Sequence, residues 1–343
     1  MKSFFRGIAA LIIVSGILLF SDLQNRSHNN GISKSLHAGN SKAMFKISLV
    51  HYVDSPNSED CEKGIRKALG ENNLKENSDY SIKVFNAQGD ISTLNSIAGS
   101  LANEKWDLVF CLSTPTLQVM MKKLSGQKIV FTNVGDPVIA GAGKSSTDHM
   151  PDICGVSTMS DFEGLIKLVK ILQPAVKRVG TVFTPSEINS VAYKDNLAAA
   201  AKRAGLELIA APAGTATEVM EAAKSLASDN IDAFCQISDN LTGSSGTSIL
   251  KVSNDNKIPF YAFVSNQMKQ GAMAACARDY FLAGFDAGEM GIQVLSGKSP
   301  GQIPFRNVSK TNFILNSERV AFYGISVPEN LMKTFPNLQI ISK

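Results

Sequence analysis

The chain has 343 residues, of which 44% are hydrophobic and 19% charged, which is normal for a globular protein with about two domains. Its net charge of +4 comes wholly from residues 1–43, and the remainder balances to zero, so the composition gives no sign of the concentrated basic surface that nucleic-acid binding requires. The five cysteines are widely spaced with no C-x-x-C pair, which excludes a zinc knuckle or a redox motif of that type.

The first residues have the order of a secretory signal. Lys2 and Arg6 precede an apolar run from Ile8 to Phe20, and a polar tract follows. The run is shorter than the roughly 20 residues that a membrane-spanning helix needs. No clean small-x-small cleavage site follows Phe20, so cleavage and uncleaved tethering both stay open. We expect residues 1–43 to be an export segment and linker, and the rest to lie on the periplasmic or extracellular side of the membrane.

From Phe45 onward, short apolar runs alternate with helical patterns, as in βαβ units. The first half is predicted to contain strands at Phe45–His51, Ser81–Asn86, Asp107–Leu112, Ile129–Thr132 and Ile153–Val156. Helices are predicted between them near Asn57–Glu71, Ile91–Glu104 and Thr116–Lys123. This pattern favours a doubly wound parallel sheet.

The second half repeats the scheme. Its predicted strands are Val179–Phe183, Glu207–Ala210, Asp232–Ile237, Phe260–Phe263 and Ala272–Ala277. Its predicted helices lie near Ser190–Ala204, Thr217–Ser228 and Ser244–Asn254. The string KWDLVFCLS from Lys105 is echoed by NIDAFCQIS from Asn230, which is consistent with an internal duplication. A helix at Phe281–Leu295 and a last stretch from Thr311 should complete the two lobes.

Ligands of open α/β sheets bind beyond the carboxyl ends of the strands, so the residues after each run are candidates. Ser113 and Thr114 stand at a predicted helix start, where free N–H groups favour an anion such as a carboxylate, although they could serve only as capping residues. In the second half, Asp239 and Asn240 offer partners for an ammonium group.

Further polar and aromatic residues follow or end other strands. The polar candidates are Asp136, Glu187, Asn189, Ser190 and Asp279. The aromatic candidates are Tyr52, Phe183 and Tyr261, and core packing is an alternative for each single ring. Because acids, amides and rings dominate, we expect a zwitterion such as an amino acid, with Asp239 or Asp279 as the partner of its ammonium group.

Catalysis finds no support in the sequence. His51 and His149 are the histidines outside the export region, and neither belongs to a recognisable triad or metal set. The string AGAGKS from Ala140 resembles a phosphate-binding loop, but the first glycine that this motif requires would be Val138. We therefore expect no catalytic residue, metal or cofactor, although doubly wound folds host many enzymes.

Several strings, in order, resemble the ABC-transporter substrate-binding proteins of the tryptophan/tyrosine-binding type. They are FNAQGD (Phe85 to Asp90), STPTLQ (Ser113 to Gln118), IVFTNVGDPVIAG (Ile129 to Gly141), PSEINS (Pro185 to Ser190), ISDN (Ile237 to Asn240) and ARDYFLAG (Ala277 to Gly284). The sequence departs from the family pattern at Gly135, where a hydroxyl residue is common.

The resemblance implies a type I periplasmic-binding fold, in which two lobes are joined by a three-segment hinge. We expect lobe 1 at 44–157 plus about 281–310, and lobe 2 at 158–280 plus about 311–343. The hinge would lie near 157–160, 278–281 and within 305–319. The implied function is capture of a small ligand, an aromatic or other amino acid, by a monomer that delivers it to ABC permease subunits. The alternative is an exported sensor that signals to a membrane partner.

Overall fold

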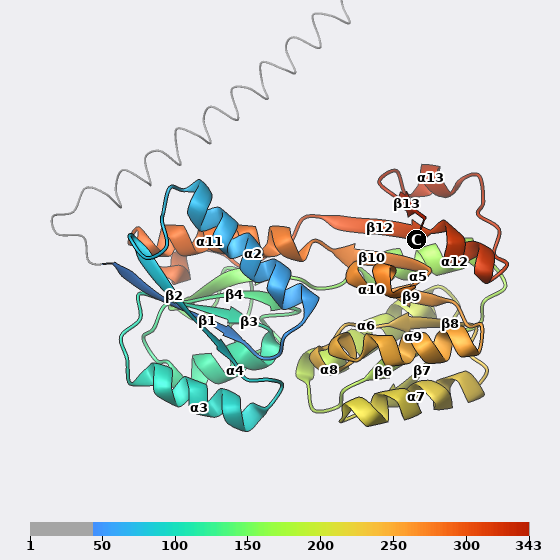
Figure 1. Cartoon of the computed structure of the whole chain (residues 1–343), viewed down its shortest axis with the longest axis horizontal. Helices are drawn as coiled ribbons and strands as arrows, with labels where there is room; N and C mark the ends of the chain where they lie inside the picture. Colours follow the sequence, from blue (N-terminus) through green and yellow to red (C-terminus); the bar gives the residue numbers. More distant parts are fainter. Residues whose placement is uncertain (1–43, 343) are drawn as a thin grey trace, which may run out of the picture.

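Two sheets, each with helices on both faces, are built from residues 44–342, the part of the chain that the computed structural model describes (Figure 1). The predicted export segment falls outside these residues. Within them, no helix combines the length and apolar character needed to cross a membrane. The expected α/β class with two doubly wound, mainly parallel sheets is confirmed.

The first sheet has the strand order β11-β5-β4-β3-β1-β2, and all its pairs are parallel. Its strands are β1 (Phe45–His51), β2 (Tyr80–Asn86), β3 (Leu108–Leu112), β4 (Ile129–Val134), β5 (Ile153–Ser157) and β11 (Arg306–Asn307). Every residue of β3 and β5 is buried, as expected for central strands covered on both faces. The covering helices are α2 (Pro56–Glu71), α3 (Ile91–Ala102), α4 (Thr114–Lys123) and α11 (Tyr280–Leu295).

The second sheet has the order β13-β12-β10-β9-β8-β6-β7, in which only β12 runs antiparallel to its neighbour β10. Its strands are β6 (Arg178–Phe183), β7 (Glu207–Pro212), β8 (Ala233–Gln236), β9 (Phe260–Ala262), β10 (Ala274–Arg278), β12 (Thr311–Asn316) and β13 (Gln339–Ile341). Its helices are α5 (Phe162–Leu172), α6 (Ile188–Arg203), α7 (Ala216–Ser228), α8 (Asn240–Ser244), α9 (Gly246–Asp255), α10 (Asn266–Gln270), α12 (Ser317–Phe322) and α13 (Leu331–Thr334). The sequence pattern did not predict α5 or the short helices α8, α10, α12 and α13.

The first five strands of each sheet follow one order, 2-1-3-4-5 in chain sequence. The strands that carry the echoed strings, β3 and β8, occupy the same central place in the two sheets. We call the half of the molecule around the first sheet lobe 1 and the half around the second sheet lobe 2.

The chain passes from one sheet to the other three times. It leaves β5 at Ser157 for lobe 2, leaves β10 at Arg278 to form α11 in lobe 1, and passes from β11 to β12 across residues 308–310. Arg278 ties two of these segments together, because its guanidinium donates hydrogen bonds to the Met159 carbonyl, at 2.7 Å, and to the Thr311 hydroxyl. Figure 1 shows these segments side by side between the lobes.

Helix α11 is held in lobe 1 by an unusually close approach to α2. A Cβ atom built on Gly64 would lie 2.1 Å from the Phe281 carbonyl oxygen, and one on Gly284 would lie 2.0 Å from that of Cys61. Only glycine at both positions lets the two backbones meet in this way. Because α11 begins directly after the second crossing, this contact fixes one end of the connection between the lobes.

Gly64→Ala and Gly70→Ala form a matched pair within α2 that tests this packing. Gly70 has no atom within 4 Å of a built Cβ. We expect Gly64→Ala to lower the free energy of unfolding by about 1–3 kcal/mol through overpacking. Gly70→Ala should be neutral or stabilising by up to about 1 kcal/mol. Chemical denaturation measures both, and equal stability of the two variants would contradict the contact.

Candidate functional site

Residues that follow the strands of both sheets enclose a small polar compartment between the lobes. From lobe 1 it is lined by Ser55, Pro56, Asn57, Ser113, Thr114 and Asn133. From lobe 2 it is lined by Asn189, Tyr193, Ser238, Asp239, Asn240, Gly243, Val264 and Asn266. Its free space is about 20 Å³, which is room for about one water molecule. The lobes touch here, since the Asn57 amide donates to the Ser238 hydroxyl at 3.4 Å.

A larger outer compartment of about 640 Å³ adjoins it, and Asn240 lines both. Lobe 1 contributes Tyr52, Val53, Gln88, Gly89, Ile91, Asn95, Pro115, Gln118, Val119, Lys122 and Lys123. Lobe 2 contributes Thr184, Ser186, Glu187, Gly214, Leu241 and Ser244 besides Asn240. Apolar side chains from both lobes line this space together with four amides, so it suits a partly apolar group that also forms hydrogen bonds.

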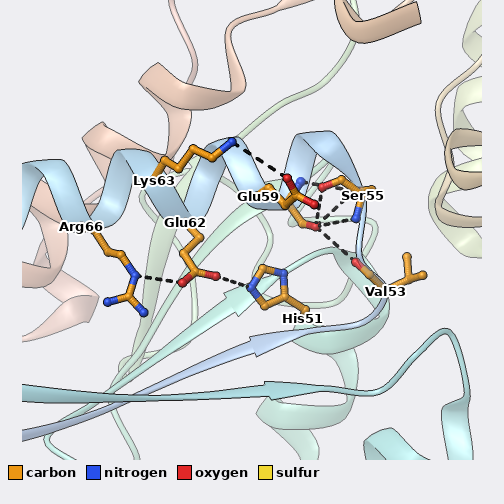
Figure 2. A network of polar contacts seen from close by, with 8 residues as sticks. His51, Val53, Ser55, Glu59, Glu62, Lys63 and Arg66 are labelled. Atoms are coloured by element: carbon orange, nitrogen blue, oxygen red, sulfur yellow. Dashed lines mark hydrogen bonds and ion pairs between the residues drawn. The ribbon is translucent and has the colours of Figure 1, made fainter. Parts of the chain in front are cut away.

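The loop after β1 supplies Tyr52 and Ser55, and the first turn of α2 supplies Asn57. This segment is anchored through α2 (Figure 2). The His51 ring nitrogen Nε2 lies 2.9 Å from the Glu62 carboxylate, which also accepts from the Arg66 guanidinium at 2.8 Å. These two hydrogen bonds lower the pKa of Glu62 to about 2 against the opposing effect of burial. His51 is therefore a buried structural residue.

Ser113 and Thr114 are at the start of α4, facing the polar compartment. The Ser113 side chain does not cap α4, and its hydroxyl instead pairs with that of Thr116 at 3.1 Å. Its backbone has φ 105° and ψ 159°, a region that residues other than glycine rarely adopt. A helix start with free N–H groups, held by a strained residue, is a suitable place for an anion.

Two amide oxygens in the polar compartment lack a partner among residues 44–342. They are Oδ1 of Asn189 and Oδ1 of Asn266, and both are buried. The Asn189 amide nitrogen is used, since it donates to Glu187 at 3.2 Å. Leaving a buried acceptor unpaired is unfavourable, so both oxygens await a hydrogen-bond donor.

Glu187 is the acid best placed to meet a ligand. Its side chain is 8% exposed, and it accepts hydrogen bonds from the amides of Asn189 and Asn240 and from the Asn240 backbone N–H. All of these reach Oε2, so Oε1 receives no hydrogen bond within the described chain. Burial, followed by the negative charge of Asp239, raises the pKa of Glu187 to about 7.

Asp239 has a different role from the one expected. Its two oxygens accept from the hydroxyl of Ser190 at 2.5 Å, the N–H of Thr184 at 3.1 Å, and both the N–H and hydroxyl of Thr242 at 2.6 Å. The carboxylate therefore caps α8 and joins it to β6, with its hydrogen-bonding capacity filled. Although it lines the polar compartment, nothing remains for an ammonium group.

Other candidates lie away from both compartments. Asp279 caps α11 and pairs with Lys310 at 3.0 Å. Partial burial would raise the pKa of Asp279, but the hydrogen bond from the Leu282 N–H and the charge of Lys310 outweigh it, so the pKa is lowered. Asp136 accepts from the backbone of Val138 in a recess beside the crossing segments. Neither of them lines the polar or the outer compartment, although the sequence suggested Asp279 as a partner of the ammonium group.

The aromatic candidates divide in the same way. Tyr52 lines the outer compartment, and burial together with the charge of Glu187 raises its pKa. Tyr261 is 0% exposed in the core of lobe 2, and its hydroxyl donates to Gln173 at 2.8 Å. The Phe183 ring packs on the same core beneath Lys194. Only Tyr52 of the three therefore reaches the cleft.

Other lining residues, from both lobes, are not among the candidates that the sequence suggests. They include Ser55, Asn57, Asn133, Tyr193 and Asn266. Asn133 immediately follows the predicted strand Ile129–Thr132, so the strand-end rule could have found it. No local pattern marks Tyr193, which lies in the interior of α6.

Comparisons with known proteins agree with this geometry. The family described as ABC transporter substrate binding protein matches residues 46–337. A tyrosine-binding protein of Clostridioides difficile (strain R20291) is 35% identical over 309 residues, which cover 90% of this chain and 89% of that protein.

Two solved structures share the fold. One is an ABC domain from Streptococcus pneumonia in complex with L-Trp, with TM-score 0.83 and 25% identity over 87% of this chain and all of that one. The other is a ligand-free, open substrate binding protein with adhesive properties from Clostridium difficile, with TM-score 0.67 and 30% identity over 88% of this chain and all of that one.

With the family matched over most of its length and a type I periplasmic-binding fold around a cleft between lobes, the chain belongs to the ABC transporter substrate-binding protein family.

Proposed function

We propose that this protein captures an aromatic amino acid between its lobes and delivers it to an ABC importer on the outer side of the membrane. The observation that carries the proposal is the polar compartment, where two buried amide oxygens without partners lie across from an uncapped helix start. Donor-seeking and acceptor-seeking groups in one small space match the two ends of a zwitterion.

The ammonium end of the ligand would meet lobe 2. Asn189 and Asn266 supply the unpaired oxygens in the polar compartment. Glu187 supplies the negative charge from the outer compartment, where it accepts a hydrogen bond from Asn240, the residue that lines both. A buried carboxylate with one free oxygen gains most from a cation, because the low dielectric strengthens their attraction. Glu187 thus takes the role first expected of Asp239 or Asp279.

The carboxylate end would meet lobe 1. The start of α4 offers backbone N–H groups and the positive end of the helix dipole, together with the hydroxyls of Ser113 and Thr114. The ligand would then join the two lobes by its opposite charges, which is the differential contact that favours the closed state.

The ligand side chain would occupy the outer compartment. Tyr52, Ile91 and Leu241 offer apolar surface, and the amides of Gln88, Asn95 and Gln118 could bind a phenol hydroxyl or an indole N–H. The tyrosine-binding relative and the neighbour solved with L-Trp support an aromatic amino acid. Delivery to a permease is supported by the family alone.

Calorimetry with matched ligands tests this assignment. We expect L-tyrosine or L-tryptophan to bind, and tyramine and 3-(4-hydroxyphenyl)propionate, which lack one charged end each, to bind at least about thirtyfold more weakly, since losing a buried charged contact costs about 2–5 kcal/mol. Mass spectrometry of ligand released from gently purified protein identifies the native compound. Binding of both analogues as tightly as the amino acid would reject the zwitterion.

Ser113 permits a paired test of strain and binding. Ser113→Gly should relieve the backbone and raise the free energy of unfolding by about 1–3 kcal/mol. Ser113→Ala keeps the strained backbone, so it should bring no such gain. Both variants lose the hydroxyl and should bind the amino acid more weakly. A glycine variant no more stable than the alanine variant in urea denaturation would contradict the inferred strain.

The affinity should depend on pH through Glu187. An ammonium partner requires the carboxylate, so affinity should rise as pH increases from about 5.5 to 8, by at most about tenfold per unit below the pKa of about 7. Binding should release protons, detectable by calorimetry in buffers of different ionisation enthalpy. Glu187→Gln should bind weakly and lose this dependence, and an unchanged pH profile in that variant would exclude Glu187.

The same pKa has the opposite effect on ligand-free stability. Because burial raises the pKa of Glu187 above its ordinary value of 4.5, folding favours the protonated form. The contribution is complete below about pH 4.5 and is lost as pH rises through about 7. In Glu187→Gln, ligand-free stability should therefore fall less over this interval.

A further inference from the structure

A tight contact joins the lobes at the inner side of the cleft. Tyr193, on α6 of lobe 2, meets Gly135, the residue after β4 of lobe 1. A Cβ atom built on Gly135 would lie 2.3 Å from the Tyr193 hydroxyl oxygen, and 2.5 and 2.7 Å from its ring carbons Cε1 and Cζ. Real atoms do not approach so closely, so any side chain at position 135 would collide with the ring itself.

Neither Gly135 nor Tyr193 can easily move away from this contact. The Gly135 carbonyl accepts a hydrogen bond from the Ser157 hydroxyl at 2.5 Å, and Ser157 is the residue at which the chain leaves lobe 1. The Tyr193 side chain is 6% exposed, belongs to the core of lobe 2, and packs beside Phe162 with ring centroids 5.9 Å apart. Close-packed cores resist such displacement, so an added methyl group would push the lobes apart.

Tyr193 also lines the polar compartment, so the contact and the binding space share one side chain. Within residues 44–342 its hydroxyl forms no hydrogen bond. The separation of the lobes at this contact sets how near Asn57 of lobe 1 comes to Ser238 of lobe 2. These two side chains form the direct hydrogen bond across the compartment.

We propose that Tyr193 is a positioning residue that sets the end point of lobe closure, and that the absence of a side chain at Gly135 permits the closed arrangement. The effect on ligand affinity rests on the proposed function, whereas the effect on closure does not. In this arrangement the Tyr193 ring blocks further closure of the lobes. The size of the residue at position 135 determines the separation of the lobes at which this contact is made.

Closure can be measured without ligand through Asn57 and Ser238. In an Asn57→Cys/Ser238→Cys background, the rate of disulfide formation with copper phenanthroline reports how often the lobes meet, because these side chains already lie 3.4 Å apart and the five native cysteines are buried. Adding Gly135→Ala should lower the fraction of molecules whose lobes are closed. Because only closed molecules can form the disulfide, a tenfold lower closed fraction would slow the reaction about tenfold, and we expect at least this effect.

Gly99→Ala is the matched control, since a Cβ atom built on this lobe 1 glycine has no atom within 4 Å. It should crosslink at the parent rate. In proteins without the added cysteines, Gly135→Ala should weaken the affinity for L-tyrosine or L-tryptophan at least about tenfold, and Gly99→Ala should leave it unchanged. Thermal melting establishes that each variant is folded.

Second-site variants separate a steric stop from general damage. Tyr193→Ala should restore crosslinking in the Gly135→Ala background, whereas Tyr193→Phe should not, because the clashing ring carbons remain. Crosslinking of folded Gly135→Ala at the parent rate, or rescue by Tyr193→Phe as complete as by Tyr193→Ala, would overturn the inference. Failure of the parent protein to bind any aromatic amino acid would reject the proposed function and leave the crosslinking result to decide the inference.

Discussion

The residues that follow the strands of both sheets enclose one shared space, and several polar groups there find no hydrogen-bond partner within their own lobe. Asn57 and Ser238 satisfy each other across the gap. Asn189 and Asn266 retain buried oxygens with no partner in the described chain. Closing the lobes without a ligand therefore leaves the free-energy cost of buried, unpaired oxygens, which a ligand with donor groups would remove. This difference in free energy couples ligand binding to closure of the lobes.

The two acids of the cleft divide structural and binding roles between them. Asp239 is held by four donors and joins β6 to α8, which places it close to Glu187. After burial itself, its charge is the largest influence that raises the pKa of Glu187. A cation arriving at Glu187 would offset both effects at once. A structural acid thus prepares its neighbour to gain more from a ligand ammonium than an exposed carboxylate would.

The fold was predictable because its signals are local. Strands such as β3, with the sequence LVFCL, are continuous apolar runs, and residues such as Asp90 and Thr215 cap the helices that follow. The rule that ligand-binding residues follow the strand ends also predicted Ser113 and Glu187, which line the two compartments. The rule does not predict which way a side chain points or which polar groups are already hydrogen-bonded.

Tyr261 and Tyr193 illustrate that limit. Tyr261 lies within β9 rather than after it, so its side chain enters the core and reaches Gln173. Tyr193 lies in a helix interior, and its meaning depends on Gly135, a residue of the other lobe. Sequence comparison marked Gly135 as a departure from the family pattern without giving a reason. The ring of Tyr193 supplies one, but only once the two lobes are placed together.

The position of that contact makes a small change large in effect. The Gly135 carbonyl accepts a hydrogen bond from the Ser157 hydroxyl, and the neighbouring Val134 carbonyl accepts one from the Thr158 N–H. The contact with Tyr193 therefore adjoins the first crossing between the lobes. The outer compartment, with Tyr52 on one side and Leu241 on the other, lies along the same cleft. In a hinged pair of rigid lobes, displacement grows with distance from the crossing. A stop near the crossing therefore needs to be precise within a fraction of an ångström, and close-packed atoms with no side chain between them provide that precision.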